Sequence, residues 1–145
     1  MRMVQGLAAL WLGLSSLSYA AGELVEIHKN AGCECCDAWG QHMERQGFRV
    51  KTIVDEALDQ TKDRAAVPKN LRSCHTATVN GYVFEGHVPP DLVRKVLKDK
   101  PKIIGLSVPG MPVGSPGMEV PSGAKAPFDV IAFDQQGRQR VFAHR

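Results

Sequence analysis

The stretch LVEIHKNAGCECCDAWGQHMERQGFRVKTIV, residues 24–54, contains the pattern that decides the fold. Its first part, Leu24 to His28, alternates apolar and polar side chains as a half-buried strand does. After a loop, an apolar face at helical spacing begins at Cys36, and Gly47 is a suitable helix stop. Alternation then resumes over 48–54. The stretch therefore predicts a strand, a helix and a second strand in succession.

The rest of the chain carries clear start and stop signals for further elements. Asp55 can cap a helix that must end near Pro68, and Pro101 ends a later helix. Asn80-Gly81 is the strongest two-residue hairpin signal. The predicted elements are a helix over 56–66, strands over 75–79 and 82–87, a helix over 90–100, a long ordered loop over 103–127, and strands over 128–133 and 140–143.

This order of elements resembles the thioredoxin fold, in which a strand, a cysteine motif, a helix and a strand precede a central antiparallel hairpin and a packing helix. The predicted fold class is therefore α/β and thioredoxin-like, with a central mixed sheet flanked by helices. A long loop rich in Gly, Pro and Met and a C-terminal hairpin complete it. Architecture alone says little about function.

The N-terminus has the features of a secretion signal. Arg2 precedes a mostly apolar stretch from Val4 to Leu17, and Ser18-Tyr19-Ala20 is a small-x-small cleavage site. We expect residues 1–20 to be removed and 21–145 to form one domain in the periplasm, where disulfides are permitted. The apolar stretch is short for a membrane span, so no stable membrane insertion is expected, although an uncleaved anchor or a buried first helix is the alternative. A net charge of +3 with scattered Lys and Arg argues against nucleic acid.

Three of the four cysteines stand within four residues, Cys33-Glu34-Cys35-Cys36. If all four cysteines were paired, one bridge would close almost no loop and would stabilise little. The C-x-x-C spacing of Cys33 and Cys36 at a helix N-terminus lowers thiol pKa values, which suits both redox exchange and metal binding. The third thiol, Cys35, interferes with clean two-thiol exchange and adds a bridging ligand, so it favours a metal.

The fourth cysteine, Cys74, precedes His75 at the start of the third predicted strand. In a thioredoxin-like layout this point lies beside the C-x-x-C motif, so four thiolates converge. Four soft ligands suit Cu(I), Zn(II) or an iron–sulfur cluster, and thioethers from the Met-containing loop favour Cu(I). His87 ends the second strand of the predicted hairpin, and His28 at the end of the first strand could also reach the site. The candidate metal ligands are Cys33, Cys35, Cys36, Cys74, His75, His87, Met111 and Met118.

Four ordered motifs resemble the CopG-like family of periplasmic copper-resistance proteins, long catalogued as a domain of unknown function. They are CECCDAW at 33–39, SCHTA at 73–77, GYVFEGHVP at 81–89 and GLSVPGMPVGSPGME at 105–119. The resemblance implies a thioredoxin-like fold and copper bound through the cysteines as Cu(I), in a thiolate-bridged cluster of several ions. It also implies a role in copper resistance and copper redox change. We expect copper ions and other periplasmic copper-handling proteins as partners.

The sequence is compatible with three functions. The leading one is a periplasmic Cu(I)-binding protein whose Cys33–Cys36 oxidation would remove donors and release metal. Storage, delivery and turnover as a copper oxidoreductase all fit that chemistry. The second is a thiol–disulfide oxidoreductase of the thioredoxin type, and the third is a structural zinc domain.

Overall fold

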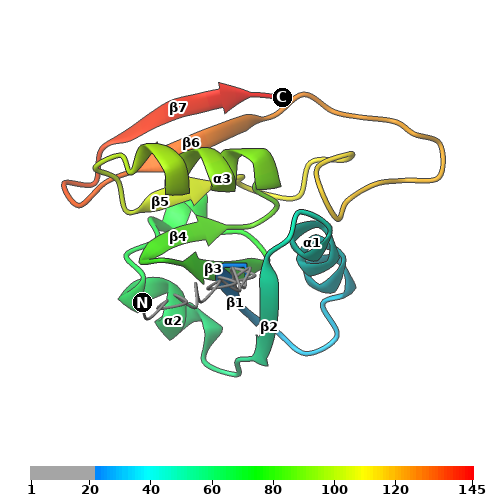
Figure 1. Ribbon diagram of the computed structural model, residues 1–145, viewed down its shortest axis with the longest axis horizontal. Coiled ribbons are helices and arrows are strands. Elements are labelled where there is room, and N and C mark those ends of the chain that lie inside the picture. Colours follow the sequence, from blue (N-terminus) through cyan, green and yellow to red (C-terminus); the bar gives the residue numbers. More distant parts are fainter. Residues whose placement is uncertain (1–21) are drawn as a thin grey trace, which may run out of the picture.

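A seven-stranded mixed sheet, in the order β2-β1-β3-β4-β5-β6-β7, forms the framework of residues 22–145. The computed structural model describes residues 22–145 (Figure 1), and the predicted signal peptide over 1–20 lies outside them. The strands are β1 Leu24–Lys29, β2 Arg49–Val54, β3 His75–Val79, β4 Tyr82–Glu85, β5 Gly105–Ser107, β6 Asp129–Phe133 and β7 Gln139–His144. The helices are α1 Glu34–Arg45, α2 Leu58–Arg64 and α3 Pro90–Asp99, with a 3-10 turn, η1, at Lys69–Leu71.

The sheet is covered on both faces, and neighbouring residues of β4 mark the two sides. Phe84 is buried in the main core with α1 residues such as Trp39 and α3 residues such as Val93. Val83, which points the other way, packs in a smaller cluster with Leu71 of η1. Side chains alternate between the faces of a strand, so α1 and α3 cover one face, and η1 lies over the other. The predicted α/β, thioredoxin-like fold with a central mixed sheet is confirmed, and the sheet is open.

The predicted strand–helix–strand start is present, with β1 and β2 parallel around α1. Two details differ. The helix begins at Glu34 with Cys33 as its N-cap, two residues before the predicted start at Cys36. In β2, Val54 is 58% exposed although its apolar character suggested an inward position. β2 is an edge strand, with a neighbouring strand only on its β1 side.

A strand also replaces the start of the long predicted loop. Gly105–Ser107 forms β5, which pairs parallel with β4 and antiparallel with β6 and is buried throughout. Three residues are too short to show a period, so the sequence gives no signal for this strand. Gly105 is required because a Cβ there would lie 1.8 Å from the Val83 carbonyl oxygen. The predicted loop over 103–127 is therefore wrong at its beginning, and the segment after Ser107 is irregular.

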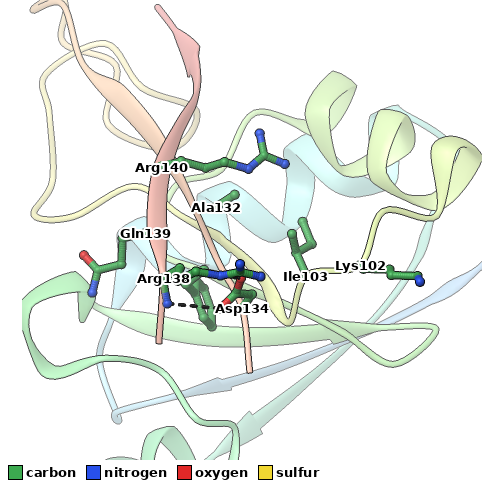
Figure 2. Close-up of a pocket in the computed structure, with 8 residues that line it drawn as sticks. Lys102, Ile103, Ala132, Asp134, Arg138, Gln139 and Arg140 are labelled. Atoms are coloured by element: carbon green, nitrogen blue, oxygen red, sulfur yellow. Dashed lines mark hydrogen bonds and ion pairs between the residues drawn. The ribbon is translucent and has the colours of Figure 1, made fainter. Parts of the chain in front are cut away.

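A surface hollow lies between the chain before β5 and the β6–β7 hairpin (Figure 2). Its volume is about 560 Å³, and Lys102, Arg138 and Arg140 line it. Asp134 neutralises one of these cations, with Arg138 Nε 2.7 Å from its carboxylate. The lining contributed by residues 22–145 includes neither cysteine nor histidine, so the candidate metal ligands lie elsewhere. In the same described part of the chain, no helix has the length and apolar character needed to cross a bilayer.

Candidate metal centre

The first half of the site is the N-terminus of α1. Cys33 and Cys36 are joined by a disulfide, with their Cα atoms 5.4 Å apart, and Cys35 keeps a free thiol 3.6 Å from the Cys33 sulfur. Cys36 is completely buried on the Trp39 face of the helix, whereas Cys33 and Cys35 are partly exposed.

The second half of the site is Cys74, which the sheet topology brings to the same place. β3 runs antiparallel to β1, and His75 at its start pairs with Lys29 at the end of β1. Because the chain leaves β1 directly into the Cys33 turn, Cys74 lies against the cysteine motif. The sulfurs of Cys33, Cys35, Cys36 and Cys74 all lie within 4.8 Å of one another. The predicted convergence of four sulfurs in one pocket is thus confirmed.

A second group of potential ligands overlaps the first at Cys74. Its sulfur lies 3.3 Å from His75 Nδ1 and 3.0 Å from His87 Nε2. The Nδ1 atom of His87 lies 2.7 Å from the carbonyl oxygen of Pro116, which can only accept. His87 Nδ1 therefore carries a proton, and in the neutral ring Nε2 presents a lone pair to the Cys74 sulfur. A histidine fixed in this way by a backbone carbonyl has the arrangement typical of metal ligands.

Both histidines are held neutral. Burial lowers the pKa of His87, and it lowers the pKa of His75 far below its usual range, with the neighbouring His87 and Lys62 adding to the effect. His75 is fully buried, with its ring centroid 4.7 Å from that of Trp39 and 5.3 Å from that of His87. Its Nε2 has no hydrogen-bond partner within residues 22–145. Buried polar atoms are rarely left unpaired, so this nitrogen is consistent with a site built for a further group.

The Cys74 thiol holds its proton in the metal-free protein. Burial, assisted by the neighbouring Cys35 thiol, raises the pKa of Cys74 to about 12. A metal that binds this sulfur must displace that proton, because only the thiolate is a strong ligand. The chemistry of the donor set therefore fits a soft metal ion. Four sulfurs and two neutral imidazoles are donors that bind Cu(I) and Zn(II) in preference to hard cations.

Two solved structures of the same fold are similar to this chain in sequence over nearly their whole length. A solved structure described as copper resistance protein CopG, form 2, has a TM-score of 0.81 and 36% identity, with 86% of this chain and 98% of that chain covered. A second structure, form 1, has a TM-score of 0.79 and 37% identity, with coverage of 84% and 96%. The chain belongs to the CopG family of copper resistance proteins. A family model for a protein of unknown function, DUF411, matches residues 71–118. No curated protein matches the chain.

In this CopG-family chain the segment after β5 lies across the N-terminus of α1. A Cβ on Gly117, which has φ +87°, would lie 2.8 Å from the Cys35 carbonyl oxygen and 2.9 Å from the Trp39 nitrogen. His42 Nε2 lies 2.6 Å from a Glu119 carboxylate oxygen and ties the same segment to the helix. The sequence carries no signal for this contact, because it joins segments that are far apart in the chain.

The two methionines of this segment occupy different surroundings. Met118 is partly buried and follows Gly117, the residue that approaches α1 closely. Met111 is 52% exposed and lines a separate hollow with Pro109 and Phe128. Their roles as ligands stay predictions. His28, the further histidine within reach by sequence, instead pairs with Asp55 at 2.9 Å.

Two buried lysines next to the site escaped sequence reasoning. Lys29 Nζ donates to the Cys33 carbonyl oxygen at 3.2 Å and to Asp37 at 2.6 Å, so it fixes the first turn of α1. Lys62 forms an ion pair with Glu85 at 2.6 Å, and both side chains are buried. A lysine at a strand end or in a short helix is usually exposed, so the sequence carried no signal for either contact.

The close approach of Gly117 to α1 can be tested directly. We expect Gly117→Ala to lower copper affinity at least about tenfold, since displacing this segment removes the Pro116 carbonyl that orients His87. Gly123→Ala is the matched control, because Gly123 has φ +71° and a Cβ added there would meet nothing within 4 Å. Both variants place an alanine at a positive φ, so the loss of stability from that backbone conformation is common to both. Equal copper affinities in a chelator competition would show that this segment does not support the site.

Proposed function

We propose that this chain binds Cu(I) through Cys33, Cys35, Cys36 and Cys74 and acts in copper resistance. The observation that carries the proposal is the convergence of the four sulfurs within 4.8 Å of one another. Thiolates are soft donors that select Cu(I), zinc and iron–sulfur clusters over hard cations. Membership of a copper-resistance family favours copper among these. CopG-family relatives supply the copper assignment, and this chain's own sulfurs supply the ligands.

Several copper ions can share this donor set. Cys74 belongs both to the four-sulfur group and to the group with His75 and His87. A thiolate in that position can bridge two ions, one held mainly by sulfur and one with imidazole ligands. The lone pair of His87 Nε2 is already oriented toward the Cys74 sulfur, so this second position needs little rearrangement.

Copper binding at this site is linked to the redox state of two thiols. With Cys33 and Cys36 in a disulfide, only Cys35 and Cys74 keep thiols. Conversion of the two thiolates to the disulfide releases two electrons, which reduce two Cu(II) ions to two Cu(I) ions. In the reverse direction, the two electrons that reopen the disulfide come from two Cu(I) ions or from another thiol reductant. A copper oxidoreductase activity of this kind is the catalytic form of the proposal.

We also propose that the protein works in the periplasm after removal of residues 1–20. The basic, apolar and small-residue regions of that segment support export. Partner proteins would then be other periplasmic copper carriers that donate or accept Cu(I). N-terminal sequencing of the protein from a periplasmic extract tests the expected cleavage after Ala20.

The proposed function is tested by metal analysis combined with thiol titration on protein prepared without air. We expect the protein to retain copper in preference to zinc. After chelator treatment, we expect the protein to stay folded and to have four titratable thiols. A structural zinc domain would instead retain zinc and unfold on chelation. Protein that takes up no copper after full reduction would contradict the proposal.

A second candidate, a thiol–disulfide oxidoreductase, is favoured by one observation, the Cys33–Cys36 disulfide at the N-terminus of α1. That position stabilises a thiolate on Cys33 through the helix dipole. The candidate predicts insulin reduction by metal-free protein. We expect no such turnover above background, because the third and fourth thiols divert the exchange reaction.

The two methionines provide a matched test of thioether ligation. We expect Met118→Leu to weaken Cu(I) about tenfold and zinc much less, because the change removes a soft donor and keeps the side-chain volume. Met111→Leu should have the smaller effect, since Met111 is 52% exposed and lines a different hollow. Chelator competition with each metal measures both. Equal losses for copper and zinc would argue against a thioether ligand.

A further inference from the structure

We propose that the buried ion pair of Lys62 and Glu85 positions Cys74 for metal binding. This inference rests on the proposed copper site, since positioning matters only if Cys74 is a ligand. Neither charged residue belongs to the group of potential ligands. Their contacts instead reach the backbone immediately before the Cys74 thiol.

The Glu85 carboxylate is the centre of a closed hydrogen-bond network. Oε1 accepts from Lys62 Nζ at 2.6 Å and from the Ser73 backbone N–H at 2.8 Å. Oε2 accepts from the Thr76 hydroxyl at 2.6 Å, and Lys62 Nζ also lies 3.0 Å from that hydroxyl oxygen. The Lys62 side chain is 4% exposed and the Glu85 side chain is fully buried. The network is therefore largely shielded from solvent, and its groups satisfy one another.

Stability alone does not account for this pair. Moving two charges out of water is costly, and two hydrophobic side chains of similar volume often give equal or greater stability in such a place. A fully satisfied buried network does, however, fix one geometry. The Lys62–Glu85 pair is therefore best explained by the geometry that it imposes on the Ser73 amide.

The chain at Cys74 needs such a constraint because it lies outside regular structure. Residues 72–74 connect η1 to β3 and have no ladder partners of their own. Glu85, at the end of β4, pairs with Thr76 in the hairpin and reaches back to Ser73. The Ser73 hydroxyl is anchored separately, by donation to the Gly110 carbonyl oxygen at 2.5 Å. Ser73 is thus held from both sides, and Cys74 follows it directly.

The same pair connects α2 to the site. Lys62 extends from α2, and it lines a hollow of about 360 Å³ together with Ser73 and Cys74. Loss of the pair would remove the contact between the Lys62 side chain of α2 and the strands β3 and β4. The Cys74 turn would then gain freedom while the cysteines of α1, which Lys29 anchors, would keep their positions.

The test uses the double variant Lys62→Met/Glu85→Leu, which replaces the pair by apolar side chains. In metal-free, reduced protein we expect alkylation of Cys74, followed by mass spectrometry, to be several-fold faster, while the rate at Cys35 is unchanged. Cu(I) affinity should fall about 10- to 100-fold, as is typical for residues that orient a ligand. In a Cys74→Ser background the double replacement should cause little further loss, because its effect acts through Cys74.

Two further variants make the result decisive. Lys95→Met/Asp99→Leu applies the same type of replacement to an exposed ion pair on α3, in which Lys95 Nζ lies 2.7 Å from an Asp99 carboxylate oxygen. This variant should change neither the Cys74 alkylation rate nor the Cu(I) affinity. Glu85→Gln keeps an acceptor for the Ser73 amide and should raise the Cys74 alkylation rate less than the double variant does. It serves alone if the double variant fails to fold.

The proposal is overturned if Cys74 alkylation is unchanged in the folded variants, or if the whole affinity loss persists without Cys74. Failure of the proposed function has a different signature. In that case wild-type protein would not bind Cu(I), yet the alkylation rates in metal-free protein would still decide whether the pair positions Cys74.

Discussion

Replacing Cys74 by serine is expected to lower Cu(I) affinity at least about 100-fold. Structural metal sites with four ligands bind with roughly 10–16 kcal/mol, so one ligand contributes about 3 kcal/mol, and about 1.4 kcal/mol corresponds to a factor of ten. Cys74 is also the residue common to both groups of potential ligands, so its loss affects every copper position. The measurement is a competition titration of the reduced protein against a Cu(I) chelator.

Serine keeps the size of the side chain, so the fold should persist and can be checked by thermal unfolding. Ser122→Ala, on an exposed part of the same long segment that carries the methionines, is a suitable control. If the Cys74→Ser protein bound the same number of copper ions with unchanged affinity, Cys74 would not be part of the site.

Reduction of the Cys33–Cys36 disulfide is expected to raise Cu(I) affinity by about 10,000-fold. Oxidised protein offers two thiols, Cys35 and Cys74, and reduced protein offers four. Two additional thiolate ligands at about 3 kcal/mol each correspond to roughly four powers of ten. Parallel anaerobic titrations of the oxidised and reduced forms, with thiols counted in each, measure the difference.

The double variant Cys33→Ser/Cys36→Ser is the matched control for this effect. It has the two thiols of the oxidised form but forms no disulfide between these positions. Its affinity should equal that of oxidised wild-type protein and should not respond to a reductant. A reductant-dependent increase of similar size in the double variant would place the redox sensitivity elsewhere.

Local patterns predicted most of the fold because the elements that surround the site carry strong local signals. Alternation identified β1, and the Asn80-Gly81 turn identified the β3–β4 hairpin. The strand β5 was missed for the opposite reason. Three residues have no period, and this strand exists only because β4 and β6 lie on either side of it.

The sulfur cluster was predictable because topology alone brings its parts together. A C-x-x-C motif after β1 and a cysteine before an antiparallel neighbour of β1 must lie near each other. The state of the histidines was not predictable, since it depends on the Pro116 carbonyl at His87 and on burial at His75. A loop that crosses a helix N-terminus leaves no periodic signal in the sequence.

The charged groups behind the site show a further limit of sequence patterns. Lys29 lies at a strand end and Lys62 in a short helix, where exposed lysines are common. Both are buried because each has a carboxylate partner and a backbone or hydroxyl group within reach. Such three-dimensional pairing connects residues that are distant in the chain, so it can be recognised only in the structure.

Site-resolved alkylation of reduced protein during a Cu(I) titration tests the shared four-sulfur copper site without any substitution. We expect Cys74 to become protected over the same copper equivalents as Cys33 and Cys35, because one pocket holds all of these sulfurs. If Cys74 were still alkylated at the metal-free rate after copper had protected the cysteines of α1, a copper site shared by the four sulfurs would be contradicted.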